Sequence, residues 1–95
     1  MTPEGTVKAE IKTYLKTLAP RLWFFSPFMS GYGASGIPDI IGVYKGRFFA
    51  IEVKAPGGRP TVWQMRMLAG IARAGGLAIV ADNVEMVREA FEPFK

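Results

Sequence analysis

The chain has 95 residues, and hydrophobic residues make up 49% of it against 21% charged residues. This length and composition predict one packed domain, residues 1–95, and exclude an intrinsically disordered chain. There is no Cys and no His, which excludes disulfides, thiolate nucleophiles, cysteine-based zinc sites and imidazole acid–base catalysis. The formal net charge of +4, with its surplus in the first two thirds of the chain, suits a polyanionic partner such as nucleic acid.

The small size also bears on partners and location. A chain of this length buries about 60 to 70% of the surface that it exposes when unfolded, so a partner subunit is a reasonable expectation. No apolar run reaches the length of about 18 residues that a membrane-spanning helix needs, and the start does not resemble a signal peptide. We therefore expect an intracellular, soluble protein without a membrane partner, and the lack of cysteines fits a reducing cytoplasm.

The first elements follow from capping and periodicity. Thr2 and Pro3 are typical of a helix N-terminus, and helical spacing of apolar residues predicts a helix over about residues 3–18. The aromatic-rich segment 22–28 predicts a buried strand. The following segment, 30–36, is too rich in glycine for regular structure and predicts a loop.

The second half alternates strands and helices. Residues 39–44 and 47–55 are expected to form a hairpin around Lys45-Gly46, and a second helix is expected from Thr61 to the stop at 75–76. Its predicted apolar side consists of Val62, Met65, Leu68, Ala69 and Ala72. A strand over 77–81 and a helix from an Asp82 cap to Phe91 complete the order α-β-β-β-α-β-α. This order predicts an α/β fold, a mixed β-sheet flanked by helices.

The hairpin brings two acidic residues together if Lys45-Gly46 is a two-residue turn. Paired residue numbers then sum to 91, so Asp39 lies opposite Glu52, with Lys54 two residues further along the same face. Like charges in this position repel unless something compensates them. A bulge at the turn would instead shift the pairing by one residue and place the acids on opposite faces.

A divalent cation would compensate the two acids. Carboxylate oxygens favour Mg²⁺ or Mn²⁺ over zinc, and such an ion lowers the pKa of a bound water and neutralises charge on a phosphoryl group. Lys54 would orient or deprotonate the water, or stabilise the transition state. The alternative is that these are solvated surface charges. The apolar strand around Glu52 and Lys54 argues against that alternative.

These residues resemble a known family. The segments Gly36-Ile37-Pro38-Asp39 and Phe49 to Thr61, with Gln64, are similar to the VRR-NUC (virus-type replication-repair nuclease) domain of the PD-(D/E)XK nuclease superfamily. The resemblance spans Thr2 to about Ala81 and implies a restriction-endonuclease-like core. It also implies a stand-alone phage-type member in the cytoplasm of a bacterial host, cutting branched DNA such as four-way (Holliday) junctions as a homodimer.

The resemblance further implies roles for individual residues. Asp39, Glu52 and the carbonyl of Val53 would bind Mg²⁺ or Mn²⁺, and Lys54 would act on the attacking water. The family also uses a glutamate on the first helix, which Glu4 matches better than Glu10, and a glutamine, which Gln64 matches. Purely structural roles remain open for both: Glu4 is a favourable acid in a first helical turn, and Thr61-x-x-Gln64 is a capping box.

Contacts with DNA are less specific in the sequence. Four polar or basic residues are candidates for binding nucleic acid: Lys8, Ser35, Arg59 and Arg66. The alternative for each is a solvated side chain. Trp23, Trp63 and the pair Phe48-Phe49 are expected in the core or a subunit interface rather than as base-stacking platforms. The expected function is a metal-dependent DNA endonuclease, and the alternative is a non-catalytic nucleic-acid-binding module on a nuclease fold.

Overall fold

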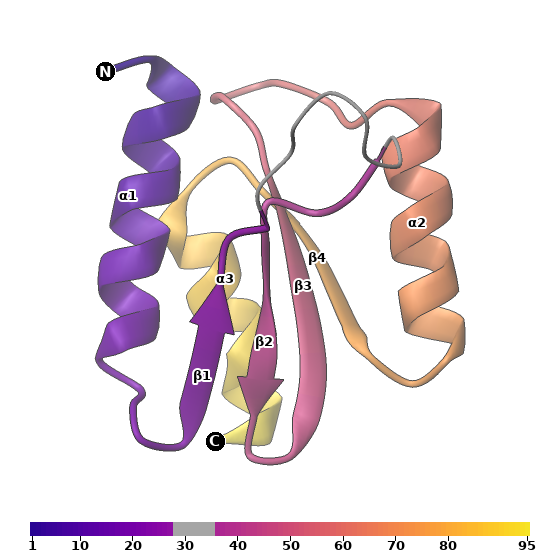
Figure 1. Cartoon of the computed structure of the whole chain (residues 1–95). Helices are drawn as coiled ribbons and strands as arrows, with labels where there is room; N and C mark the ends of the chain where they lie inside the picture. Colours follow the sequence, from indigo (N-terminus) through magenta and orange to yellow (C-terminus); the bar gives the residue numbers. More distant parts are fainter. Residues whose placement is uncertain (28–35) are drawn as a thin grey trace.

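The computed structural model describes residues 1–27 and 36–95, and these residues form a four-stranded sheet with helices on both faces (Figure 1). In chain order the elements are α1 (Pro3–Lys16), β1 (Leu22–Phe25), β2 (Ile40–Tyr44), β3 (Arg47–Val53), α2 (Val62–Arg73), β4 (Leu77–Ala81), α3 (Val84–Phe91) and a 3₁₀ turn (Glu92–Phe94). The strand order is β1-β2-β3-β4, antiparallel up to β3 and parallel between β3 and β4. The predicted element order and mixed sheet are confirmed.

The hairpin between β2 and β3 has the predicted register. Ile40 pairs with Ile51 and Tyr44 with Arg47, and Lys45 and Gly46 both have positive φ, 51° and 82°. Two positive φ angles are the mark of the type I′ turn, whose twist matches that of the flanking strands. The register with no bulge places Asp39, which directly precedes β2, next to the end of β3.

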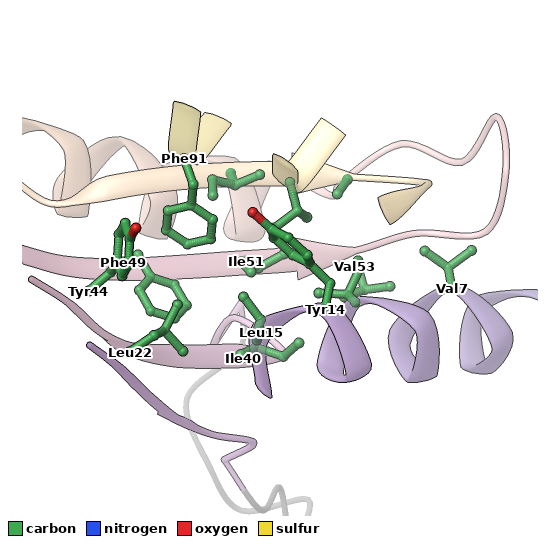
Figure 2. Close-up of a cluster of buried hydrophobic side chains, with 14 residues drawn as sticks. Val7, Tyr14, Leu15, Leu22, Ile40, Tyr44, Phe49, Ile51, Val53 and Phe91 are labelled. Atoms are coloured by element: carbon green, nitrogen blue, oxygen red, sulfur yellow. The ribbon is translucent and has the colours of Figure 1, made fainter. Parts of the chain in front are cut away.

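The hydrophobic core lies on one face of the sheet, beneath α1 and α3. Figure 2 shows Val7, Tyr14 and Leu15 of α1 and Phe91 of α3 meeting side chains of the strands. Phe91 packs edge-on against both Tyr44 and Phe49, with ring centroids 5.2 and 5.1 Å apart. Phe49, Ile51 and Val53 of the central strand β3 point into this core, whereas Ala50 and Glu52 are buried on the opposite face of the sheet.

The first strand differs from its prediction. β1 ends at Phe25 rather than 28, and it is only half buried, because Trp23 and Phe25 are 64% and 45% exposed. The reason is that β1 is an edge strand, with α1 and α3 covering the opposite face of the sheet. Phe28, the end of the predicted strand, lies outside the described residues, as does most of the predicted glycine-rich loop.

The buried side of α2 also differs from its prediction. Of the five apolar residues expected to face the protein, only Leu68 is buried, whereas Val62 and Met65 are 66% and 52% exposed. Gln64 and Ile71 are half-buried instead. The inward side of α2 is formed by Gln64, Met67, Leu68 and Ile71. Gln64 hydrogen-bonds to Glu52 on the sheet, and apolar periodicity does not report such a polar inward contact.

The last helix begins one residue later than predicted. Asn83, not Asp82, caps α3, with its side-chain oxygen accepting a hydrogen bond from the amide of Met86 at 3.0 Å. The Asp82 carboxylate instead accepts a hydrogen bond from the amide of Gly57. None of the helices in the two described ranges is long and apolar enough to cross a bilayer.

Candidate active site

Two acidic residues approach each other where β2 begins and β3 ends. The Oδ2 atom of Asp39 accepts a hydrogen bond of 2.8 Å from the backbone amide of Val53, which ties the carboxylate to the neighbouring strand. Glu52, the residue before Val53, is buried, with 3% of its surface exposed. The predicted pairing of Asp39 with Glu52 on one face of the sheet thus agrees with the observed register.

The surroundings of Glu52 disfavour the charged form of its carboxyl group, and a neighbouring lysine compensates this only in part. Burial, followed by the charge of Asp39, raises the pKa of Glu52 to about 7, and the ammonium group of Lys54 opposes this rise. Lys54 Nζ lies 3.2 Å from Glu52 Oε2, and the Lys54 side chain is itself only 14% exposed. One buried lysine beside two carboxylates leaves the site short of positive charge.

Gln64 connects the start of α2 to this pair. Its Nε2 donates to Glu52 Oε2 at 2.9 Å, and its Oε1 accepts from the amide of Thr61 at 2.8 Å. The hydroxyl of Thr61 accepts from the amide of Gln64 at 3.2 Å, which completes the predicted capping box. Both interpretations of Gln64 in the sequence are therefore compatible: one side chain caps the helix and contacts the buried acid.

Asp82 is a residue of this region that the sequence predicts only as a helix cap. Its Oδ2 accepts from the amide of Gly57 at 3.0 Å, and the amide of Lys54 donates to the carbonyl of Ala81 at 2.9 Å. These two contacts fasten the segment after β3 to the end of β4. The feature of the sequence that points to this fastening role is that Asp82 directly follows the apolar segment of β4, the strand that pairs with β3.

The remaining predicted site residues come from several parts of the chain. Glu4 is exposed in the first turn of α1, and among the described residues no cluster of three or more acidic side chains includes it. Lys8 is half-buried on α1, while Arg59 and Arg66 are exposed. Ser35 lies outside the described residues. Figure 1 shows the N-terminal ends of α1 and α2 at the same end of the molecule as the start of β2 and the end of β3.

The segment from Lys54 through α2 has an uneven charge. Residues 54–76 contain four of the 12 basic residues of the chain and none of its 8 acidic residues, so this segment alone accounts for the net charge of +4. The basic residues are Lys54, Arg59, Arg66 and Arg73. The element that contacts Glu52 through Gln64 is therefore the most positive part of the chain.

The fold, a mixed four-stranded sheet flanked by helices, belongs to the restriction-endonuclease-like class of α/β folds. More particularly, the fold is that of a VRR_NUC domain. A solved structure described as "VRR_NUC domain" matches it with a TM-score of 0.81 and 23% sequence identity, and the match covers all of both chains.

A curated relative comes from Acyrthosiphon pisum secondary endosymbiont phage 1. It is named "Putative nuclease p44" and is 34% identical over 55 residues, which are 57% of this chain. The match spans 59% of that protein's own length. A comparison with protein-family models finds no match.

Proposed function

We propose that the protein is a divalent-metal-dependent DNA endonuclease that hydrolyses phosphodiester bonds. The observation that carries this proposal is that Glu52 is buried beside Asp39, with Lys54 Nζ lying 3.2 Å from Glu52 Oε2. Burying Glu52 next to a second, half-buried acid is costly, and a cation offsets that cost. The VRR_NUC fold and the name of the phage relative, "Putative nuclease p44", support the nuclease part of this proposal.

The donor set fits Mg²⁺ or Mn²⁺. Asp39 and Glu52 supply hard carboxylate oxygens, and the carbonyl of Val53 is the proposed third protein ligand, with water and a phosphate oxygen available to complete the coordination. Neither Cys nor His is present to favour a softer metal. When bound, the ion would lower the pKa of a water molecule and neutralise charge on the phosphate.

The remaining side chains would orient the reactants. Lys54, held against Glu52 by an ion pair, positions the attacking water and stabilises the negative charge that develops on the phosphate. Gln64 fixes the Glu52 carboxylate through its 2.9 Å hydrogen bond. Glu4 is proposed as a further acid at the same end of the molecule, acting on substrate or a second water.

DNA would reach the site along the positive segment 54–76. Arg59 and Arg66 are exposed there and are proposed to contact phosphates, as are Lys8 and Ser35 from the first part of the chain. Counterion release would then make affinity fall with salt. The phage origin of the relative supports action in the cytoplasm of a bacterial host.

The test is incubation of purified protein with labelled junctions, flaps, nicked duplexes and single strands, with Mg²⁺, with Mn²⁺ and with a chelator. We expect cleavage only with metal, and none from Asp39→Asn. Glu89→Gln, which changes an exposed acid on α3, is the matched control and should cut normally. A folded protein that cuts none of these DNAs would refute the enzymatic proposal and favour a binding module.

We further propose that branched DNA is cut by a homodimer that uses the exposed face of the sheet. Trp23, Val43 and Phe48 form one cross-strand row there, with Phe25 beside them, and these four side chains are 41 to 64% exposed. Their row lies on the face that carries Asp39 and Glu52, so a second copy would bring a second site alongside. Two sites would let one particle nick two strands of a junction.

Light scattering coupled to size exclusion tests this interface. Phe48→Glu should convert dimers to monomers, because it places a charge in the centre of the apolar row. Met86→Glu is the control, since Met86 is similarly exposed, at 40%, on α3 and on the opposite side of the sheet. Equal dimerisation of both variants would rule out this surface.

A further inference from the structure

The side chain of Trp63 is exposed to solvent, although burying a tryptophan normally stabilises a folded protein. Its side chain is 60% exposed in the first turn of α2, so of the two places predicted from the sequence, the core and a subunit interface, it does not lie in the core. An indole carries a large apolar surface that folding normally hides. An exposed aromatic ring beside a charged site is typical of a surface that binds a partner.

The backbone of Trp63 is fixed relative to both acids of the candidate site. The next residue, Gln64, hydrogen-bonds to Glu52. On the other side, a Cβ atom added to Gly36 would lie 2.7 Å from the carbonyl oxygen of Trp63, so the turn that leads to Asp39 packs directly against this helical turn. The indole is therefore attached to a rigid part of the site.

The chemistry around the ring is cationic. The guanidinium carbon of Arg66 lies 5.1 Å from the centre of the Trp63 ring, within the range of a cation–π contact. Both residues belong to segment 54–76, which has four basic residues and no acid. An exposed aromatic face next to basic side chains is the combination that binds single-stranded nucleic acid, through base stacking and phosphate contacts.

From this placement we propose that Trp63 stacks on an unpaired base of the DNA strand that enters the site, while Arg66 contacts the adjoining phosphate. This inference rests on the proposed nuclease function and adds a substrate class to it: DNA with unpaired or splayed nucleotides next to the cleaved bond. A fully paired blunt duplex exposes a base face only at its two ends, so it gains much less from the indole.

Intrinsic fluorescence tests the stacking directly, because the chain has only two tryptophans. In a Trp23→Phe protein, Trp63 is the sole tryptophan. With Ca²⁺ in place of Mg²⁺ to hold DNA without cleavage, titration with a single strand and with a flap should quench its emission, and titration with blunt duplex should quench it less.

The affinities supply the second measurement. Trp63→Ala should weaken binding of the single strand and the flap by about tenfold, the usual effect of losing one stacked base, with a much smaller loss for blunt duplex. Trp63→Phe should retain part of the affinity. Met65→Ala is the matched control, because Met65 is 52% exposed in the same helical turn and should leave all affinities unchanged.

Two results would overturn the stacking proposal. The first is DNA binding with no change in Trp63 emission and with Trp63→Ala equal to wild type. The second is emission that changes with protein concentration and not with DNA, which would assign the ring to a contact between copies. Either result leaves metal-dependent cleavage intact, whereas loss of cleavage with intact quenching would refute the proposed function and not the stacking.

Discussion

Glu52 is the residue whose environment departs furthest from what its chemistry prefers. It is an acid inside a strand whose neighbours Ile51 and Val53 are fully buried, and its pKa is raised to about 7, mainly by burial and then by Asp39. Lys54 and Gln64 both contact its Oε2 atom, which stabilises the charged form only in part. An ionisable group held in this way is typical of a functional site.

This environment predicts an unusual dependence of stability on pH. The pKa of Glu52 is about 7 in the folded chain and near 4.5 when unfolded, so between these values the folded state holds the extra proton. Stability of the metal-free protein should therefore fall as pH rises from about 4.5 through 7, by roughly 3 kcal/mol for a shift of this size. Urea unfolding of chelator-treated protein across this range measures it.

The matching variant is Glu52→Gln, which removes the titrating group but keeps its size. Its unfolding free energy should lack the decline, and above pH 7 it should exceed that of the metal-free wild type. A wild-type protein that gains stability over the same interval would show that Glu52 is not held at a raised pKa.

Lys54 is expected to act in the reaction more than in folding. Lys54→Met keeps the aliphatic stem but removes the ammonium group 3.2 Å from Glu52. Cleavage with Mg²⁺ should fall by at least about 100-fold, the range found when a group acting on the nucleophilic water is lost. Circular dichroism and DNA affinity should stay close to wild type; if affinity vanished together with activity, the lysine would be a structural or DNA-binding residue.

Gln64 has two contacts that one substitution can separate. A glutamate in this position still accepts the hydrogen bond from the amide of Thr61, so Gln64→Glu preserves the capping box of α2. It replaces the amide donor to Glu52 by a third negative charge. We expect an unfolding temperature within a few degrees of wild type when Mn²⁺ is present, together with cleavage reduced by about tenfold or more. Unchanged cleavage would limit Gln64 to a capping role.

Among the elements, β2 depends on a glycine at its centre. A Cβ atom at Gly42 would overlap the carbonyl oxygen of Trp23 in β1 and lie 2.8 Å from the Phe49 ring. Because a backbone atom cannot move aside cheaply, Gly42→Ala should destabilise the protein by about 3 kcal/mol, at the upper end for overpacked sites. Thermal unfolding measures the loss.

At Gly70, in contrast to Gly42, the structure leaves room for a side chain. It lies within α2, and a Cβ atom there would have nothing within 4 Å. Gly70→Ala should therefore stabilise the protein by about 1 kcal/mol, since alanine is the better helix former. Equal effects of the two substitutions would mean that β1 and β2 do not pack as closely as described.

The sequence predicts some elements better than others, for physical reasons. The β2–β3 hairpin follows from local rules, because a Lys-Gly turn with two positive φ angles fixes the register and hence the position of Asp39 relative to Glu52. The capping box at Thr61 is equally local. Interactions between residues close in the chain leave a pattern in the sequence, so these parts of the site can be predicted from it.

Contacts between residues far apart in the sequence account for the differences between the predicted and the observed elements. The contact of Gln64 in α2 with Glu52 spans 12 residues of sequence, and the contact of Asp82 with the amide of Gly57 spans 25 residues. Burial of β1 depends on which face the helices cover. Apolar periodicity reports none of these relations, which is why the predicted faces of α2 and β1 and the predicted cap of α3 are wrong.

For the whole molecule, charge and apolar surface both fall on the side of the candidate site. Segment 54–76 carries the net charge, and α2 packs on the sheet face of Glu52, where Trp23, Phe25 and Phe48 are exposed as well. On the opposite face, α1 and α3 cover the sheet and form the hydrophobic core with it. The molecule is therefore two-sided: one side holds the fold together, and the other presents the acids, the basic residues and exposed aromatic rings.

The central claim is that Asp39 and Glu52 together bind a divalent cation, and Mn²⁺ binding tests it most directly. Electron paramagnetic resonance follows the signal of free Mn²⁺ as metal-free protein is added well above pH 7, where Glu52 is ionised. We predict saturable loss of the signal with wild type and with the surface variant Glu85→Gln, and no such loss with Asp39→Asn or Glu52→Gln. A folded wild-type protein that leaves the signal unchanged, or acid variants that bind Mn²⁺ as tightly as wild type, would contradict the account.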